Sequence, residues 1–243
     1  MAGVMLVTGS SRGIGAATAR LAAERGYKVC VNYVRERGAG EALAREIGGI
    51  AVAGDVSVEA DVVRLFAEVD RRLGRLMVLV NNAGVVDRVA RVDEMSAARL
   101  ERMFAINVTG SFLCAREAVK RMSTRHGGAG GSIINLSSVA ARIGAPAMYV
   151  DYAAAKGAID TLTLGLSKEV GGEGIRVNAV RPGVIRTEIH ASGGEPGRAE
   201  RIGATAPLGR AGDPEEIARA ILWLASDEAS YVSGAILDVA GGR

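Results

Sequence analysis

Tyr152 and Lys156 are the residues whose types and spacing most directly suggest chemistry, in the segment Tyr152-Ala153-Ala154-Ala155-Lys156. On a helix, residues four apart lie on one face, so the phenol and the ammonium can converge on the same volume. A free phenol has a pKa of about 10, and a nearby cation favours the phenolate. The pair is therefore a candidate proton donor beside a group that makes it more acidic. For an isolated pair of this kind, the alternative is decoration of a helix surface.

A glycine-rich segment near the start of the chain is a candidate phosphate cradle, Thr8-Gly9-Ser10-Ser11-Arg12-Gly13-Ile14-Gly15. Its glycines directly follow an apolar strand pattern and lead into a helical pattern, which is the context that a dinucleotide-binding loop requires. Glycines allow a tight turn and close approach to a pyrophosphate, and amides at the helix start favour negative charge. The spacing is Gly-x-x-x-Gly-x-Gly rather than the commoner Gly-x-Gly-x-x-Gly, and a turn without ligand is the alternative.

The end of the second apolar strand indicates which dinucleotide to expect. NAD-selective proteins usually carry a carboxylate there, roughly 20 residues beyond the glycines. This chain has Asn32-Tyr33-Val34-Arg35, and its first acid is Glu36. Arg12 and Arg35 could each bind the additional 2′-phosphate of an NADP-type cofactor. We therefore expect NADP(H) to be preferred, with NAD(H) possible, although Arg35 could instead be a solvated loop residue.

Apolar runs of strand length alternate with amphipathic helical stretches along the whole chain, which predicts an α/β fold with a parallel, doubly wound sheet and helices on both faces. No linker divides the chain, so one domain over residues 1–243 is expected. The stretch 187–212 interrupts the alternation and is a candidate substrate lid. The seven expected strands are Val4–Thr8, Lys28–Tyr33, Ile50–Ala53, Met77–Asn81, Gly131–Ser137, Ile175–Arg181 and Ala235–Val239. The expected helices are Ile14–Arg25, Gly38–Ile47, Val58–Leu73, Ala97–Arg125, Asp151–Val170 and Pro214–Leu224.

Composition narrows the classes of function. The chain has 243 residues and 49% apolar content, enough for a substantial core. Its net charge of +3 comes from scattered basic residues, so no nucleic-acid surface is expected. No apolar run approaches the ~20 residues that span a bilayer, and no basic leader precedes the first strand, so we expect a soluble cytoplasmic protein. Neither the cysteines nor the histidines have metal-ligand spacing, and no metal site is expected.

Taken together, these motifs resemble the short-chain dehydrogenase/reductase family over almost the whole chain. The resemblance implies a Rossmann-like fold, a nicotinamide cofactor, and interconversion of a carbonyl and a secondary alcohol. The segment 149–156 and the ending 237–243 are similar to the branch with glucose-dehydrogenase-like and 3-oxoacyl-carrier-protein-reductase-like enzymes. The residues that carry the family resemblance are Thr8–Gly15, Asp55, Asn81, Asn82, Ala83, Gly84, Asn107, Ser138, Tyr152, Lys156, Pro182 and Gly183.

The same resemblance implies catalytic roles for Asn107, Ser138, Tyr152 and Lys156. Tyr152 would supply the proton, Ser138 would hydrogen-bond the carbonyl oxygen, and Lys156 would hold the nicotinamide ribose and lower the Tyr152 pKa. Asn107 would kink its helix and hold a water that relays protons to Lys156, and a satisfied buried amide is the alternative. The interval from Ser138 to Tyr152 is one residue longer than the commonest family spacing, so Ser137 must be weighed; we interpret Ser137 as structural.

Further cofactor contacts are implied only by the family pattern. They lie at the ends of the expected strands, where the carboxyl edge of a parallel sheet opens to a ligand. Among these contacts, Asp55 and Val56 are expected at the adenine, the backbone of Ile185 at the carboxamide and Thr187 at a phosphate. The full set of expected contacts, including the glycine loop, is Gly9, Ser11, Arg12, Gly13, Ile14, Gly15, Tyr33, Arg35, Asp55, Val56, Asn82, Ala83, Gly84, Tyr152, Lys156, Pro182, Gly183, Ile185 and Thr187.

Two other functions remain open from the sequence. One is a 3-oxoacyl-carrier-protein reductase, whose acidic partner would need exposed arginines near the site mouth, such as Arg121, Arg125 or Arg142. The other is a non-catalytic nucleotide-binding regulatory protein, against which the intact Ser138, Tyr152 and Lys156 argue. The family resemblance also implies a homotetramer or homodimer, formed through the two long helices Ala97–Arg125 and Asp151–Val170.

Overall fold

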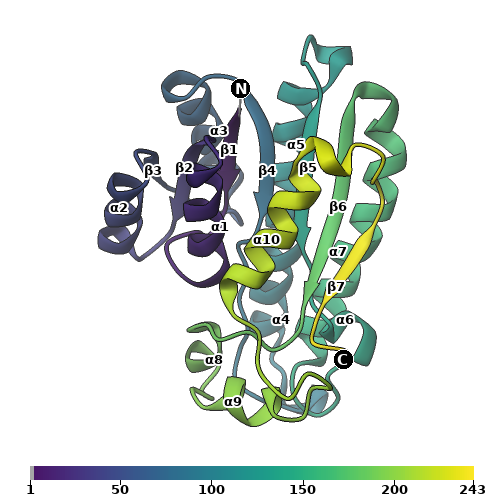
Figure 1. Ribbon diagram of the computed structural model, residues 1–243. Helices are drawn as coiled ribbons and strands as arrows, with labels where there is room; N and C mark the ends of the chain where they lie inside the picture. Colours follow the sequence, from purple (N-terminus) through teal and green to yellow (C-terminus); the bar gives the residue numbers. More distant parts are fainter. Residues whose placement is uncertain (1–2) are drawn as a thin grey trace.

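The seven runs rich in Val, Ile and Leu form one sheet of parallel strands, in the order β3-β2-β1-β4-β5-β6-β7 (Figure 1). The computed structural model describes residues 3–243, apart from the side chains of His190 and Ser192. Each strand lies within one residue of its predicted bounds, because buried parallel strands have continuous apolar sequences. The strands are β1 Val4–Val7, β2 Lys28–Tyr33, β3 Ile50–Ala53, β4 Leu76–Asn81, β5 Gly131–Leu136, β6 Ile175–Pro182 and β7 Ile236–Val239. The predicted Rossmann-like, doubly wound fold is confirmed.

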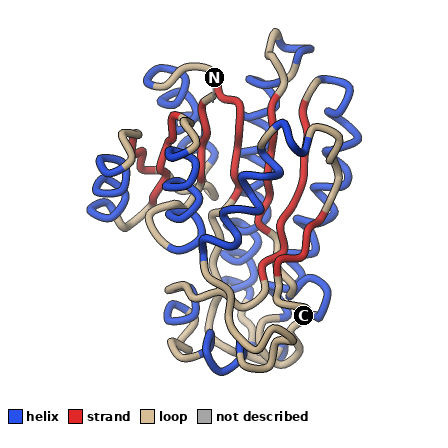
Figure 2. The backbone as a smooth tube through the Cα atoms, in the orientation of Figure 1, coloured by secondary structure: helices blue, strands red, loops and turns tan. Residues whose placement is uncertain are grey.

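Helices cover both faces of the sheet (Figure 2), and the two hydrophobic cores show which helices pack on which face. One core joins the sheet to α1, α2 and α10, and the other joins it to α3, α5 and the end of α7. The helices are α1 Gly13–Glu24, α2 Arg37–Glu46, α3 Glu59–Arg72, α4 Ala97–Phe104, α5 Gly110–Met122, α6 Ala140–Ile143, α7 Val150–Val170, α8 Ile189–Ser192, α9 Arg198–Gly203 and α10 Pro214–Ala225.

The long helix expected over Ala97–Arg125 is not continuous. A π-helical turn, Ala105–Thr109, separates α4 from α5, and a short 3₁₀ turn follows α5 at Thr124–His126. Asn107 lies at the centre of the π-helical turn and is fully buried. A π-turn breaks the regular i to i−4 ladder, and such turns are frequent at functional sites. Helical periodicity does not reveal it, because the apolar face continues through the interruption.

The order of the strands reverses between β1 and β4, since the chain moves outward through β2 and β3 before returning to β4. In open α/β sheets the crevice at such a point, at the carboxyl ends of the strands, is where ligands bind. The chain leaving β6 passes this edge and forms α8 and α9, which lie beyond the lower end of the sheet in Figure 1. This segment is pinned by a bridge between Ile185 and Gly212 and by the Leu208 amide, which donates to the Gly241 carbonyl at 3.1 Å.

Within residues 3–243, no helix is long and apolar enough to cross a membrane. The same part of the chain contains no cluster of His, Cys, Asp and Glu that could hold a metal ion. Cys30 and Cys114 are both fully buried, and burial raises the pKa of each thiol to about 12. Both cysteines are small core residues.

Candidate active site

The glycine loop between β1 and α1 has the shape of a cradle that side chains would fill. Gly9 and Gly13 have φ values of +59° and +55°, in the left-handed region that favours glycine. A Cβ on Gly9 would approach the Cα of Ala83 to 2.8 Å, and one on Gly15 would approach the Asn82 Nδ2 to 2.5 Å. This loop, at the N-terminus of α1, therefore fits the pyrophosphate of a dinucleotide.

Two asparagines hold that loop in place, Asn32 fully buried and Asn82 half-buried. The Asn82 Nδ2 donates to the carbonyls of Thr8 at 2.8 Å and Gly9 at 3.0 Å. The Asn32 Oδ1 accepts from the Gly9 amide at 3.0 Å, and its Nδ2 donates to the Gly54 carbonyl at 2.9 Å. Asn82 was expected as a cofactor contact, whereas Asn32 was not singled out. In the sequence, Asn32 could have been recognised as a polar residue near the end of an otherwise apolar strand.

A cavity of about 1160 Å³ runs along the carboxyl edge of the sheet. It exceeds the 300–1,000 Å³ that is common for ligand pockets, so it has room for a dinucleotide and a substrate. Of the predicted site residues, Asn107 alone does not line it. Those that do are Gly9, Ser11, Arg12, Gly13, Ile14, Gly15, Tyr33, Arg35, Asp55, Val56, Asn82, Ala83, Gly84, Ser138, Tyr152, Lys156, Pro182, Gly183, Ile185 and Thr187.

At the expected adenine end, Asp55 is held by its neighbours. Its Oδ1 accepts from the Ser57 amide at 2.9 Å and the Ser57 hydroxyl at 2.6 Å, while its own amide donates to the Asp61 carboxylate at 2.9 Å. Arg35 and Glu36 are exposed at the rim of the same end. The rim therefore presents one cation and one anion, and the cation directly follows Val34 after β2.

Tyr152, Ser138 and Lys156 converge at the opposite part of the cavity. The Tyr152 phenol is hydrogen-bonded to Ser138, and the Lys156 Nζ lies 5.6 Å from the centroid of the Tyr152 ring. Nζ also donates to the Leu136 carbonyl at 2.6 Å. The Ser138 Oγ accepts from the Ala140 amide at 3.1 Å, so Ser138 also binds the first amide of the short helix α6.

Ser137 occupies a different position from Ser138. Its side chain is buried, and its hydroxyl donates to the backbone carbonyl of Lys156 at 3.2 Å. This bond joins the end of β5 to α7, so the Ser137 hydroxyl is engaged by the backbone of the helix. The geometry supports the structural interpretation of Ser137.

Burial dominates the acid–base properties of the pair. It raises the pKa of Tyr152 to about 12, and only the hydrogen bond with Ser138 opposes this effect. Burial also lowers the pKa of Lys156 to about 8, opposed by the nearby carboxylate of Asp160. The pKa of Tyr152 is therefore raised overall, whereas the spacing to Lys156 predicted that it would be lowered. Lys156 is itself desolvated, and its ammonium is directed to the Leu136 carbonyl.

Asn107 is a fully satisfied buried amide beside the same site. Its Oδ1 accepts from the Val85 amide at 3.2 Å, and its Nδ2 donates to the carbonyls of Val85 and Met103, both at 3.0 Å. A Cβ on Gly84 would lie 2.8 Å from Asn107 Oδ1 and 3.5 Å from Lys156 Nζ, so these groups are neighbours. The side chain thus fixes the chain after β4, and its relay role stays a prediction.

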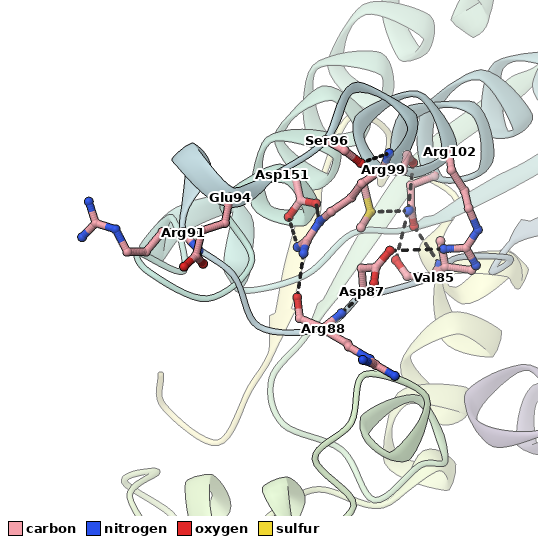
Figure 3. A network of polar contacts seen from close by, with 11 residues as sticks. Val85, Asp87, Arg88, Arg91, Glu94, Ser96, Arg99, Arg102 and Asp151 are labelled. Carbon is pink, nitrogen blue, oxygen red and sulfur yellow. Dashed lines mark hydrogen bonds and ion pairs between the residues drawn. The ribbon is translucent and has the colours of Figure 1, made fainter.

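Arg99 was not singled out from the sequence, and it binds the carboxylate of Asp151 directly before Tyr152 (Figure 3). The figure shows both residues in a polar network that also contains Arg88 and Asp87, on the chain segment after β4. Asp151 is buried although it lies in the first turn of α7. In the sequence, the signal for this pair was the carboxylate of Asp151 directly before Tyr152, the candidate proton donor.

The part of the cavity beyond Tyr152 is largely apolar, with one cationic side chain from the expected lid. The Arg198 guanidinium, on α9, lies 5.0 Å from the ring centroid of Tyr149 and 3.1 Å from the Glu195 carboxylate. Apolar residues on this part of the lining are Val85, Val86, Ile143, Met148, Ile189 and Ile202. A substrate would therefore meet apolar walls close to the hydroxyl groups of Ser138 and Tyr152.

Comparison with known proteins identifies this arrangement. A family model described as enoyl-(acyl carrier protein) reductase matches residues 9–243. The chain belongs to the short-chain dehydrogenase/reductase family. Among its relatives in this family, the uncharacterized oxidoreductase YgfF of Escherichia coli (strain K12) is 54% identical over 245 residues, covering 99% of each chain. The cis-4-hydroxycyclohexanecarboxylate dehydrogenase of Sinomonas cyclohexanicum is 42% identical, covering 98% of this chain and 95% of that protein.

A solved structure of the family has the same fold. It is the 3-ketoacyl-(acyl-carrier-protein) reductase from Brucella melitensis complexed with NADH, with a TM-score of 0.93, 30% identity, and coverage of 99% of this chain and 98% of that one. As a short-chain dehydrogenase/reductase, the present protein is an oxidoreductase that acts on CH–OH groups or the corresponding carbonyls of small molecules with a nicotinamide dinucleotide. The predicted family, enzyme class and cofactor class are confirmed.

Proposed function

We propose that the protein interconverts a carbonyl and a secondary alcohol with NADP(H), and that Tyr152 is its acid and base. The observation that carries the proposal is the convergence of Tyr152, Ser138 and Lys156 on one cavity that continues to the glycine loop. A proton donor, a second hydrogen-bond donor and a phosphate cradle are what hydride transfer to a carbonyl requires from a protein. A regulatory nucleotide-binding protein would not need the first two.

In the reductive direction, a bound nicotinamide dinucleotide supplies the hydride. Negative charge then develops on the carbonyl oxygen, and Tyr152 donates a proton to it. Its pKa of about 12 keeps the phenol protonated at neutral pH. Ser138 accepts a hydrogen bond from the Ala140 amide, so its own hydroxyl proton can hold the carbonyl oxygen in place. Below its pKa of about 8, Lys156 retains donors for the ribose hydroxyls besides the one used on the Leu136 carbonyl.

Replacing Tyr152 by Phe tests the catalytic proposal directly. We expect Tyr152→Phe to lower kcat for reduction of a carbonyl panel by at least about 100-fold, the scale of general acid catalysis. Cofactor affinity, measured by NADPH fluorescence titration, should stay close to that of the parent protein, because the glycine loop is intact. Tyr231→Phe, at a fully exposed position that does not line the cavity, is the matched control for removing a phenol. Near-normal turnover of Tyr152→Phe would contradict the proposal.

The preference for NADP(H) is proposed from the charges near the glycine loop and β2. Arg12 and Arg35 both line the cavity, and no carboxylate precedes Glu36 at the end of β2. We expect kcat/KM to be higher with NADPH than with NADH. We also expect Arg35→Ala to lower kcat/KM for NADPH about tenfold while leaving the NADH value within about twofold, because only the former has a 2′-phosphate. A higher efficiency with NADH in the parent enzyme would overturn this preference.

A carrier-protein reductase is the second candidate, favoured by the 3-ketoacyl-(acyl-carrier-protein) reductase fold match. The arginines considered for docking do not form one cluster. Arg121 and Arg125 lie at the end of α5 and just beyond it, near the start of β5, and Arg121 pairs with Asp70 and Glu117. Arg142 lies in α6, after the carboxyl end of β5. Small carbonyl substrates therefore remain the better proposal.

We further propose that the protein assembles as a homotetramer through α4, α5 and α7, and that residues 187–212 are the substrate lid. Large apolar side chains are exposed on α4, α5 and α7, among them Phe104, Phe112 and Leu164. On α7, a Cβ at Gly157 or Gly165 would meet open space, so another helix could approach closely. For the lid, the support is the contact of Arg198 with Tyr149 beside the cavity.

A further inference from the structure

Arg99 and Asp151 form a buried, two-pronged ion pair between the first turns of α4 and α7 (Figure 3). The Arg99 Nε donates to Asp151 Oδ2 at 2.8 Å, and Nη2 donates to Oδ1 at 3.2 Å. The Asp151 side chain is 0% exposed and that of Arg99 is 11% exposed. Because Asp151 immediately precedes Tyr152, this pair fixes the turn of α7 that carries the proposed proton donor.

The same guanidinium makes a third contact, with the chain that follows β4. Its Nη1 donates to the Arg88 carbonyl at 2.8 Å. We call residues 85–88 the wall segment, because Val85, Val86 and Asp87 line the cavity together with Tyr152. One planar group therefore binds both the start of the helix that bears Tyr152 and a wall of the substrate cavity.

Other polar contacts hold the wall segment at its remaining points. Asn107 pairs with both backbone groups of Val85, and Arg102 lies 3.5 Å from the Asp87 carboxylate. Just beyond the segment, the Ala90 amide donates to the Met148 carbonyl at 3.1 Å. The contacts to Asn107 and Arg102 reach α4 and the π-helical turn, but within the described residues only Arg99 joins the wall to α7 through a side chain.

From this geometry we propose that Arg99 and Asp151 are positioning residues that set substrate specificity by fixing the wall segment relative to Tyr152. The inference rests on the proposed carbonyl chemistry. A ketone that reaches Tyr152 and Ser138 must place its two substituents against the cavity walls, and Val85 and Val86 offer an apolar surface to one of them. The favoured substrate is thus a ketone with one apolar substituent, and the width left by the wall decides which carbonyl face is attacked.

The chemistry of the pair favours a geometric role over a purely stabilising one. A buried ion pair costs much desolvation, and replacing one by apolar side chains of similar volume is often neutral or stabilising. A guanidinium offers rigid, coplanar donors, which suit one carboxylate and one carbonyl at fixed angles, whereas a lysine ammonium cannot reproduce this fork. The structure uses that fork in full, with Nε, Nη1 and Nη2 all engaged.

The test compares three variants of the full-length protein with the parent. The double variant Arg99→Met/Asp151→Leu removes both charges together, and Arg99→Lys keeps the charge but loses the fork. Arg91→Met is the matched control, because Arg91 follows the same stretch of chain, pairs with Asp93 at the surface and does not line the cavity. The measurements are hydrogen exchange of residues 85–90, NADPH affinity, and the kinetics and product enantiomer ratio with prochiral ketones.

We expect faster exchange at residues 85–90 in both Arg99 variants, with unfolding temperatures of the double variant close to the parent. KM for the ketone should rise about tenfold and the enantiomer ratio should fall, since small displacements at a reacting centre have effects of this size or larger. NADPH affinity should change by less than about twofold, because the glycine loop lies elsewhere. The Arg91→Met control should match the parent in every measurement.

Unchanged exchange and enantiomer ratio in the Arg99 variants would overturn the inference. A fall in kcat alone, with unchanged hydrogen exchange at residues 85–90, would also overturn the inference. The ion pair would then act on Tyr152 without affecting the wall segment. If the double variant does not fold, Arg99→Lys decides between these outcomes. If the parent enzyme reduces no ketone in the panel, the proposed function fails instead, and the hydrogen exchange of residues 85–90 alone confirms or refutes the positioning role.

Discussion

Lys156 sits where two requirements conflict. In the proposed mechanism its ammonium must stay charged to hold ribose hydroxyls, yet the residue is 4% exposed and burial lowers its pKa to about 8. Asp160, one turn further along α7, favours the charged form and thereby limits the decrease in pKa. Tyr152 has the opposite problem, because the burial that keeps it protonated for reduction makes its ionisation costly in the oxidative direction.

The buried ammonium should leave a signature in the pH dependence of stability. In the unfolded chain Lys156 keeps its proton up to about 10.5, whereas in the fold it loses the proton near 8. Between these values the unfolded state binds more protons, so the free energy of unfolding rises with pH, by up to about 3 kcal/mol for this group. Lys156→Met lacks this contribution. We expect Lys156→Met to exceed the parent in stability most strongly below pH 8.

Urea unfolding of the two proteins between pH 7 and pH 10 measures this difference. The advantage of Lys156→Met should shrink steadily as the pH rises above about 8. Lys168→Met, at an exposed position near the end of the same helix, is the control and should show no such trend. A difference that is constant with pH would show that Lys156 is not desolvated in the fold.

At the scale of elements, loops rather than strands decide what the site can accept. The sheet positions Ser138 and the glycine loop, while the wall segment, residues 143–149 and the segment 187–212 contribute side chains to the lining of the cavity. Between α6 and α7, Ala145 and Ala147 adopt φ values of +44° and +56°, which L-residues rarely do. This turn lies within the interval from Ser138 to Tyr152 and directly precedes Tyr149, which contacts Arg198 of α9.

The lid contact should affect substrate binding more than chemistry. Arg198→Met removes the cation that lies over the Tyr149 ring, an interaction worth about 0.5–2 kcal/mol. We therefore expect KM for the substrate to rise several-fold while kcat stays near the parent value. Arg201→Met is the matched control, because Arg201 also pairs with Glu195 but is 58% exposed and does not line the cavity. Equal effects of the two substitutions in steady-state kinetics would refute a specific role for the Arg198 contact.

At the scale of the whole molecule, both α5 and α7 carry large apolar side chains that are exposed. Phe112 is 50% exposed and Leu164 is 44% exposed. Apolar side chains gathered on a surface commonly mark sites of association. Close packing of a second copy against these helices would remove them from water, which is the physical basis of the proposed tetramer.

Introducing charge on these helices tests the assembly. We expect light scattering during gel filtration to give a tetramer for the parent protein at micromolar concentration, and a smaller species for Phe112→Glu/Leu164→Glu. A desolvated carboxylate at an interface is costly, so two per subunit should shift the equilibrium strongly. Val63→Glu, at a position of equal exposure on α3, should remain tetrameric. A monomeric parent would contradict the proposed assembly.

The sequence by itself determined the order and bounds of the strands and the residues that gather around the cavity. Runs such as Lys28–Tyr33 are apolar because both faces of a parallel strand are buried, and that requirement is local enough to read along the chain. The glycine loop and the Tyr152 and Lys156 pair are equally local. Their positions at strand ends and on one helix face follow from the residue periodicity of strands and helices.

Only the tertiary structure decided the features that depend on distant neighbours. Asp151 and Arg99 are 52 residues apart, and their pairing depends on how α4 packs against α7. The π-helical turn at Asn107 and the pKa of Tyr152 likewise depend on surroundings supplied by several elements. Spacing predicted that Lys156 would acidify Tyr152, but desolvation of both groups outweighs that attraction, and burial becomes known only when the chain has folded.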